Sequence, residues 1–249
     1  MEYVNREPEV TVNILTIPRR EEQLGACLEG LRQQTYMGAK VQIIGFFNEN
    51  ILADFRKDLE IRVIRVDLGI ARKRSLAVTK TTTKYAAFID DDEIPSKNWL
   101  KELLDTIEKY ENVGVITGPV ITPLHMLLPK MFLQNVSMSL SLLRKLFWNY
   151  FYEGKLLQPG EIVNGLFTIG HFLPTSVNKI VQVNVSGFGN ILFPTWVAKK
   201  ILIDPIYNYA YEDYDFVIRV RRLGYKVLYN TRAFVFHLPR IKENEDVNR

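Results

Sequence analysis

Short apolar runs alternate with amphipathic stretches along the first half of the chain. The apolar runs are typical of buried strands and cover residues 10–16, 41–47, 61–66 and 85–89. After the first run, Leu24, Cys27, Leu28 and Leu31 recur at the spacing of one helix face, and residues 70–80 also favour a helix. Strands that alternate with helices predict an α/β fold with a mostly parallel sheet covered by helices on both faces.

The alternation continues to residue 119, stops, and resumes near residue 180. Residues 95–111 predict a helix with Ser96 as its candidate cap, followed by a strand within residues 113–119. The second half then predicts a strand at residues 180–185, a Gly-rich turn at 186–190, a helix begun by Pro194, a helix from Tyr211, and two short strands at 226–229 and 233–237. We find no repeat, low-complexity segment or linker, so a single domain over residues 1–249 is the simplest interpretation.

The composition is that of a folded protein and excludes several classes. Of 249 residues, 47% are hydrophobic, and the net charge of +4 is scattered in short basic groups that do not predict a nucleic-acid partner. Cys27 is the single cysteine of the sequence, so an internal disulfide is excluded. Its position fits an inert core residue, and the lack of disulfides fits a reducing compartment. Neither a signal-peptide core nor an apolar run of about 18–20 residues is present. We therefore expect a cytoplasmic protein, either soluble or peripheral on the cytoplasmic face of a membrane.

Three consecutive aspartates, Asp90 to Asp92, follow the apolar run at residues 85–89. Ligands of parallel sheets bind beyond the carboxyl ends of the strands, where these carboxylates are expected to lie. If extended geometry continues, Asp90 and Asp92 project to the same side, roughly 6 to 7 Å apart. Their repulsion then costs about 2–3 kcal/mol at an effective dielectric near 20, and Mg²⁺ or Mn²⁺ would remove that cost. The alternative is an acidic, solvated turn that caps the next helix.

A second carboxylate occupies a position where helical spacing favours a hydrophobic residue. Asp213 shares a stripe with Phe216, Val217 and Val220, in the first turn of a predicted helix. The helix dipole there favours the ionised carboxylate, which suits a general base. The alternative is that Glu212 or Asp213 caps the helix.

His237 ends the last predicted strand, and a histidine at that position is either structural or a ligand. Taken in order, an opening strand and helix, the Asp triplet, a Gly turn, the pair Glu212–Asp213 and a final histidine resemble the GT-A glycosyltransferases. The likeness is to the large, mostly inverting, nucleotide-sugar-dependent family, and it runs from about Val10 to His237. It rests on VNILTIPRREEQLGACLEGLRQQTY, RSLAVTKTTTKYAAFIDDD, VNVSGFGNILFPTWVAKKI and EDYDFVIRVRRLGYKVLY.

The resemblance implies a GT-A (Rossmann-like) fold and a donor site for a nucleotide diphosphate sugar. The nucleotide-binding half would span about residues 8–120, and the acceptor-side half, with an inserted helical segment, about residues 121–240. By position, Asp90 would contact the ribose, with Asp91 and Arg74 in the same nucleotide site. Asp92 would bind a Mg²⁺ or Mn²⁺ ion that bridges the diphosphate, and His237 would reach the metal or the diphosphate.

On the acceptor side, the resemblance implies that Asp213 deprotonates a hydroxyl group, with Glu212 contacting the acceptor or a loop. The implied reaction is transfer of a single sugar, with inversion, to a glycan, lipid-linked or protein acceptor. Without catalysis, the same fold could serve as a nucleotide- or sugar-binding protein. A nucleotidyltransferase is a further alternative, but "TIPRREEQLG" is a poor version of the phosphate loop that it requires.

The chain departs from the family pattern at the ends of its first two predicted strands. Asn48 or Glu49 stands where the family often has an aspartate that reads the base. Pro18 and Arg19, which replace the usual end of the first strand, are positional candidates for the nucleotide pocket. The segment Leu124–Gly170 mixes aliphatic and aromatic residues with lysine and arginine. It suits either the core or a homodimer interface, or a surface that rests on an anionic membrane.

Overall fold

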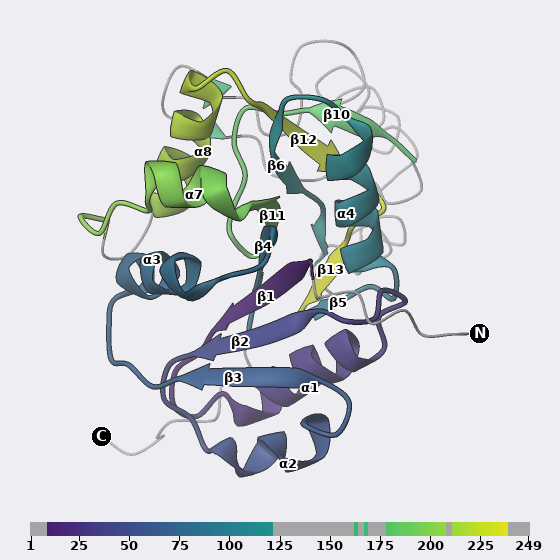
Figure 1. The fold of residues 1–249 in the computed structure, drawn as a ribbon, viewed down its shortest axis with the longest axis vertical. Helices are drawn as coiled ribbons and strands as arrows, with labels where there is room; N and C mark the ends of the chain where they lie inside the picture. The colour runs from purple at the N-terminus through teal and green to yellow at the C-terminus, as the bar shows by residue number, and fades with distance from the viewer. Residues whose placement is uncertain (1–8, 122–161, 164–166, 169–177, 208–210, 239–249) are drawn as a thin grey trace, which may run out of the picture.

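The computed structural model describes residues 9–121, 162–163, 167–168, 178–207 and 211–238. Its centre is an eight-stranded sheet with the strand order β10-β12-β6-β11-β4-β1-β2-β3. Figure 1 shows α1 and α2 on one side of β1, β2 and β3, and α3, α7 and α8 grouped on the other. The structure therefore has the layered α/β architecture predicted from the alternating pattern.

The elements have the following bounds. The strands of the large sheet are β1 (Val10–Leu15), β2 (Lys40–Ile44), β3 (Glu60–Ile64), β4 (Tyr85–Asp90), β6 (Val113–Thr117), β10 (Ile180–Gln182), β11 (Asn190–Pro194) and β12 (Lys226–Asn230). Two smaller sheets contain β5 (Glu93–Pro95), β7 (Val120–Ile121) and β13 (Val235–His237), and β8 (Ile162–Val163) with β9 (Phe167–Thr168). The helices are α1 (Glu21–Arg32), α2 (Leu52–Phe55), α3 (Ile70–Lys80), α4 (Trp99–Lys109), α7 (Thr195–Ile201), α8 (Glu212–Arg222) and the 3-10 helix η1 (Glu49–Ile51).

The large sheet is mostly parallel. Parallel pairs join β1 to β2 and β4, β2 to β3, and β6 to β12. β11 runs antiparallel between β4 and β6, and β10 pairs antiparallel with β12. The carboxyl ends of β1 and β4 lie side by side, because Leu15 is in register with Asp90. This register brings the segment after β1 next to the Asp triplet.

Each face of the sheet has its own hydrophobic core. On β4, Tyr85, Ala87 and Ile89 pack with α1 and α4, whereas Ala86 and Phe88 pack with α3, α7 and α8. The alternation follows from the two-residue period of a strand. Both faces of β4 are buried, so the strand is apolar up to Asp90, where the sheet ends.

Buried amides attach α3 to the sheet. The Nε2 atom of Gln42 donates to Oδ1 of Asn13 (2.8 Å) and to the carbonyl of Ala77 on α3 (3.1 Å). Asn13 in turn donates to the carbonyl of Ala87 (3.1 Å). Buried amides are costly unless they are hydrogen-bonded, so this set specifies how α3 sits on the sheet. The orientation of α3 matters because it carries Arg74.

Asn190 at the start of β11 fixes the segment that leads into β13. Its Nδ2 atom donates to the carbonyls of Pro119 (3.1 Å) and Ala233 (2.7 Å), and its Oδ1 atom accepts from the indole of Trp99 (2.8 Å). All of these groups are deep in the fold, and Asn190 itself is 2% exposed. β13, which ends at His237, is therefore held against the central sheet.

Several sequence expectations need correction or lie outside the described residues. The helix predicted for residues 95–111 begins only at Trp99, and Ser96 does not cap it, because the Ser96 hydroxyl is buried without a hydrogen-bond partner. β11 was not predicted at all. Apart from β8 and β9, the segment Leu124–Gly170 lies outside the described residues, and so does the membrane or interface role expected for it. Among the described residues, no helix combines the length and apolar character needed to cross a bilayer.

Candidate active site

The Asp triplet forms a tight turn between two sheets. β4 ends at Asp90, Asp91 and Asp92 form the turn, and β5 begins at Glu93, so the extended geometry considered for Asp90 to Asp92 stops at Asp90. The backbone amide of Leu238 donates to the carbonyl of Asp92 (2.7 Å). The turn is therefore attached directly to the end of β13.

Asp91 is the most buried aspartate of the three, and both of its oxygens have partners. Its Oδ2 atom accepts from the hydroxyl of Thr16 (2.7 Å), and its Oδ1 atom accepts from Nη1 of Arg20 (2.5 Å). The same Nη1 atom lies 3.1 Å from Oδ2 of Asp92. The sequence analysis named Arg19 and missed Arg20. Arg20 reaches the turn because the register of β1 with β4 places the end of β1 beside it.

His237 approaches the same oxygen of Asp92. Its Nε2 atom lies 3.7 Å from Oδ2 of Asp92, and the imidazole is 35% exposed. The antiparallel register of β13 with β5, which pairs His237 with Glu93, produces this proximity. A histidine that sequence reasoning could interpret as either structural or a ligand therefore faces the acidic turn.

Arg74 connects the acidic turn to α8. Its guanidinium lies 3.6 Å from Oδ1 of Asp90 and forms an ion pair with Oε1 of Glu212. It also packs over the ring of Phe188, at 4.7 Å from the centroid. Arg74 and Glu212 are both buried, and Oε2 of Glu212 has no hydrogen-bond partner in the described structure. Arg74 thus joins the residue proposed for the ribose to the helix that carries the candidate base.

Asp213 lies in the first turn of α8 and does not cap it. The residue before the helix is Tyr211, which has a left-handed backbone (φ 74°), and Oδ1 of Asp213 accepts from the next amide, Tyr214 (2.8 Å). Burial raises the pKa of Asp213, the Tyr214 hydrogen bond opposes that rise, and the negative charge of Glu212 adds to it. A half-buried carboxylate with a raised pKa suits a proton acceptor.

The loop before β11 faces both carboxylate groups. A Cβ atom added at Gly187 would lie 3.5 Å from Oδ2 of Asp213. One added at Gly189 would lie 2.7 Å from Oε1 of Glu93 and 3.0 Å from Oδ2 of Asp90. The Gly-rich turn seen in the sequence therefore lies along both halves of the site, and its missing side chains leave room for the carboxylates.

Gly189→Ala is expected to destabilise the protein, whereas Gly187→Ala is expected to be tolerated. The new methyl group at residue 189 would lie 2.7 Å from the carboxylate of Glu93, which is 3% exposed, and must displace it. Overpacking of this kind costs about 1–3 kcal/mol. Urea denaturation of the two variants measures the difference. Equal stability of both would mean that the acidic turn adjusts freely to a side chain at residue 189.

Glu93 is a fourth acidic residue at the turn, and sequence reasoning did not single it out. It is 3% exposed, and Oε2 accepts from the amide of Asp90 (3.3 Å). Burial raises the pKa of Glu93 well above its ordinary value, and the charges of Asp90 and Asp92 raise it further. Glu93 therefore adds a fourth acidic side chain to the turn, and its raised pKa favours the uncharged form beside Asp90 and Asp92.

The positional candidates at the ends of β1 and β2 lie on the surface. Pro18 and Arg19 are exposed, and Arg19 has a left-handed backbone (φ 67°). Asn48 is also exposed, and its side chain accepts from the amide of Asn50 at the start of η1. Lys73, which was not predicted, is buried nearby and donates to the carbonyl of Thr16 (3.0 Å). No contact joins Pro18, Arg19 or Asn48 to the acidic turn in the described interactions.

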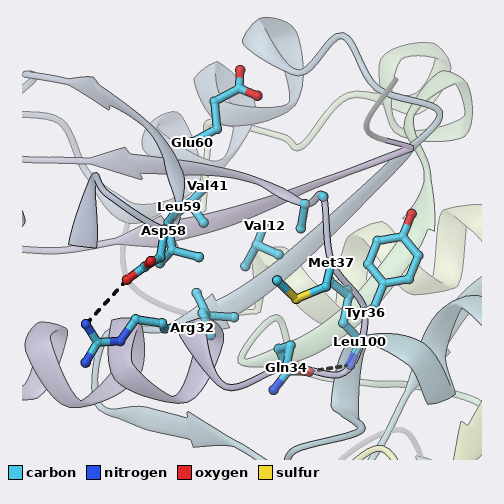
Figure 2. Close-up of a pocket in the computed structure, with 13 residues that line it drawn as sticks. Val12, Arg32, Gln34, Tyr36, Met37, Val41, Asp58, Leu59, Glu60 and Leu100 are labelled. Carbon is cyan, nitrogen blue, oxygen red and sulfur yellow. Dashed lines mark hydrogen bonds and ion pairs between the residues drawn. The ribbon is translucent and has the colours of Figure 1, made fainter. Parts of the chain in front are cut away.

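A cavity of about 390 Å³ lies elsewhere, between α1 and the strands. Its lining includes Val41 and Glu60, near the amino ends of β2 and β3, and Met37 (Figure 2). These residues are at the amino ends of the parallel strands, whereas the aspartates follow the carboxyl end of β4. The cavity is therefore separate from the candidate active site.

The residues at the turn fit a divalent cation only in part. Within the described ranges, no group of three or more His, Cys, Asp or Glu side chains is arranged to hold a metal ion. Asp92 and His237 nevertheless present a carboxylate oxygen and an imidazole nitrogen to the same space. Mg²⁺ is commonly held by one or two protein ligands together with substrate phosphates. The pair fits a metal whose remaining ligands come from a diphosphate and water.

The chain resembles known proteins both in its sequence family and in its fold. The family model described as "Glycosyl transferase family 2" matches residues 14–172. A search of curated protein sequences gives no match to this chain.

Among solved structures, S. aureus TarS is 15% identical over 93% of this chain and 37% of its own length, with a TM-score of 0.59. TarS 1-349 in complex with UDP is 14% identical over 93% of this chain and 60% of its own, with a TM-score of 0.58. GalNAc-T7 with UDP, GalNAc and Mn²⁺ is 13% identical over 96% of this chain and 45% of its own, with a TM-score of 0.67. These structures share the fold, and the chain spans less than two thirds of the length of each.

Proposed function

Because this chain belongs to glycosyl transferase family 2, we propose that it transfers a single sugar from a nucleoside diphosphate sugar to an acceptor hydroxyl. The reaction proceeds with inversion and depends on Mg²⁺ or Mn²⁺. Solved structures that share the fold contain UDP, and one of them contains Mn²⁺. The observation that carries the proposal is the link between Asp90 and Glu212 through Arg74, because it brings the carboxyl end of β4 together with the start of α8.

On the donor side, Asp90 contacts the ribose, and Asp92 and His237 would hold a divalent cation. A bound cation neutralises the negative charge that develops on the departing nucleoside diphosphate. Asp91 contributes indirectly, because both of its oxygens are occupied by Thr16 and Arg20 and it is 3% exposed. We therefore assign Asp91 the role of positioning Arg20 rather than that of contacting the nucleotide.

On the acceptor side, Asp213 removes the proton from the attacking hydroxyl. Its raised pKa brings the carboxylate closer to the working pH of a general base. Glu212 is held by Arg74 and is 2% exposed, so it orients the start of α8 instead of exchanging protons with the acceptor. Attack from the side of Asp213, opposite the diphosphate, gives inversion at the sugar carbon.

The proposal is tested by the release of nucleoside diphosphate from a panel of nucleotide sugars. We expect slow, Mn²⁺-dependent hydrolysis of at least one UDP- or GDP-sugar without acceptor, and faster release when a hydroxyl acceptor is added. Release of UDP or GDP identifies the base, and product analysis identifies the sugar. Binding of a nucleotide sugar without turnover under any acceptor condition would favour the non-catalytic binding protein instead.

A further inference from the structure

Arg20 occupies the space next to the oxygen that the proposed metal would use. Its Nη1 atom lies 2.5 Å from Oδ1 of Asp91 and 3.1 Å from Oδ2 of Asp92, and its side chain is 18% exposed. The contact with Asp91 is the shorter one, and Asp91 is itself anchored by the hydroxyl of Thr16. The guanidinium is therefore held at the turn by a residue that is not a candidate metal ligand.

This position creates a conflict of charge with a metal ion. A Mg²⁺ ion bound to Oδ2 of Asp92 at about 2.1 Å would lie within about 5 Å of the Arg20 Nη1 atom, which is 3.1 Å from that oxygen. The guanidinium stays charged at all working pH values, so it cannot relieve the repulsion by losing a proton. Asp92 and His237 offer only two ligands, which do not outweigh a neighbouring cation.

A diphosphate changes this balance. It brings negative charge that offsets both cations, it supplies oxygen ligands that complete the coordination of a metal, and it offers acceptors to the guanidinium. We propose that Arg20 is a resident cation that keeps Asp92 closed to a divalent metal until a nucleoside diphosphate binds. The inference rests on the proposed function and adds the order of assembly: metal alone binds weakly, and metal and nucleotide bind together.

The proposal implies that metal and nucleotide each raise the affinity of the protein for the other. If nucleotide raises the affinity for metal by some factor, metal raises the affinity for nucleotide by the same factor. Removing the charge of Arg20 raises the affinity for metal alone, so it also lowers this coupling factor. Arg20 controls the access of metal to Asp92, so its removal alters metal binding in the absence of any reaction.

The test is calorimetric titration with Mn²⁺ alone, without nucleotide. Arg20→Gln is expected to bind Mn²⁺ about tenfold more tightly than the wild type or better, a factor within the usual range of coupling between sites. Arg20→Lys retains the charge and is expected to stay close to the wild type. Lys57→Gln is the matched control, because it removes one positive charge from an exposed pair with Asp54. Equal Mn²⁺ affinity of the wild type and Arg20→Gln, or tight binding by Arg20→Lys, overturns the proposal.

Arg20→Gln leaves Asp91 without its guanidinium partner, so circular dichroism must establish that the variant folds. If it does not, Arg20→Ala, which leaves room for water to reach the Asp91 carboxylate, replaces it in the same titration with Mn²⁺ alone. A gain of about tenfold or more in Mn²⁺ affinity supports the proposal, and an unchanged affinity overturns it. Failure to bind any of UDP, GDP, CDP, ADP and dTDP would refute the proposed function. Metal-dependent nucleotide binding with equally tight binding of Mn²⁺ alone would refute only the role of Arg20.

Discussion

Asp213→Asn is expected to lower turnover by about a hundredfold or more while leaving the affinity for nucleoside diphosphate nearly unchanged. The amide keeps the volume of the side chain and can still accept from the Tyr214 amide, which is the contact that Asp213 makes at the start of α8. It cannot take up a proton from the acceptor. Steady-state kinetics with a responsive nucleotide sugar, together with calorimetry for the diphosphate, separates the two effects.

Asp215→Asn is the matched control, since it changes the same helix at a carboxylate paired with Arg219. A turnover of Asp213→Asn equal to that of this control would exclude Asp213 as the general base.

The dependence of turnover on pH gives a second test of the role of Asp213. Burial raises the pKa of Asp213, so its basic form is lost as the pH falls through a value above the ordinary 3.8. As the pH is lowered, turnover should therefore begin to decline at a higher pH than it would with an unperturbed aspartate. Burial is the main cause of the raised pKa, and the charges of Glu212 and Arg74, which raise and lower it, act less strongly.

Asp92→Ala is expected to abolish the part of nucleoside diphosphate affinity that depends on metal. Asp92 lies 3.7 Å from His237, and without it the imidazole would be the one remaining protein ligand of the proposed metal. In calorimetry with Mn²⁺, the affinity of the variant for UDP or GDP should fall by about tenfold or more, to the value measured without metal. Asp105→Ala, which removes an exposed carboxylate paired with Lys101, serves as the control. Unchanged Mn²⁺-dependent binding by Asp92→Ala would exclude this residue as the metal ligand.

Local patterns in the sequence were sufficient for much of the fold. The helix expected at residues 70–80 coincides with α3 (Ile70–Lys80), and the stripe of Phe216, Val217 and Val220 is buried in α8 as its spacing predicts. Cys27 is buried among apolar residues on α1. These features depend on spacing within a few residues, which a single sequence displays directly.

The interactions that sequence reasoning missed join residues far apart in the chain. Arg20 meets Asp91 and Asp92 only because β1 and β4 are neighbours in the sheet, and Arg74 meets Glu212 only because α3 and α8 lie on the same face. β11 was missed because it follows a Gly-rich turn and ends in Pro194, both of which count against a strand. Proline is tolerated there because it is the last residue of the strand.

The place of β11 in the sheet also determines which pieces of this protein can exist alone. β11 forms hydrogen bonds with β4 on one side and with β6 on the other, although it comes far later in the sequence than either strand. A fragment that stops after β6 would leave both strands with open edges, and open edges invite association with other chains. We therefore expect that the chain up to β6 does not fold as a separate module, because β4 and β6 gain β11 as their shared neighbour only when the later part of the chain is present.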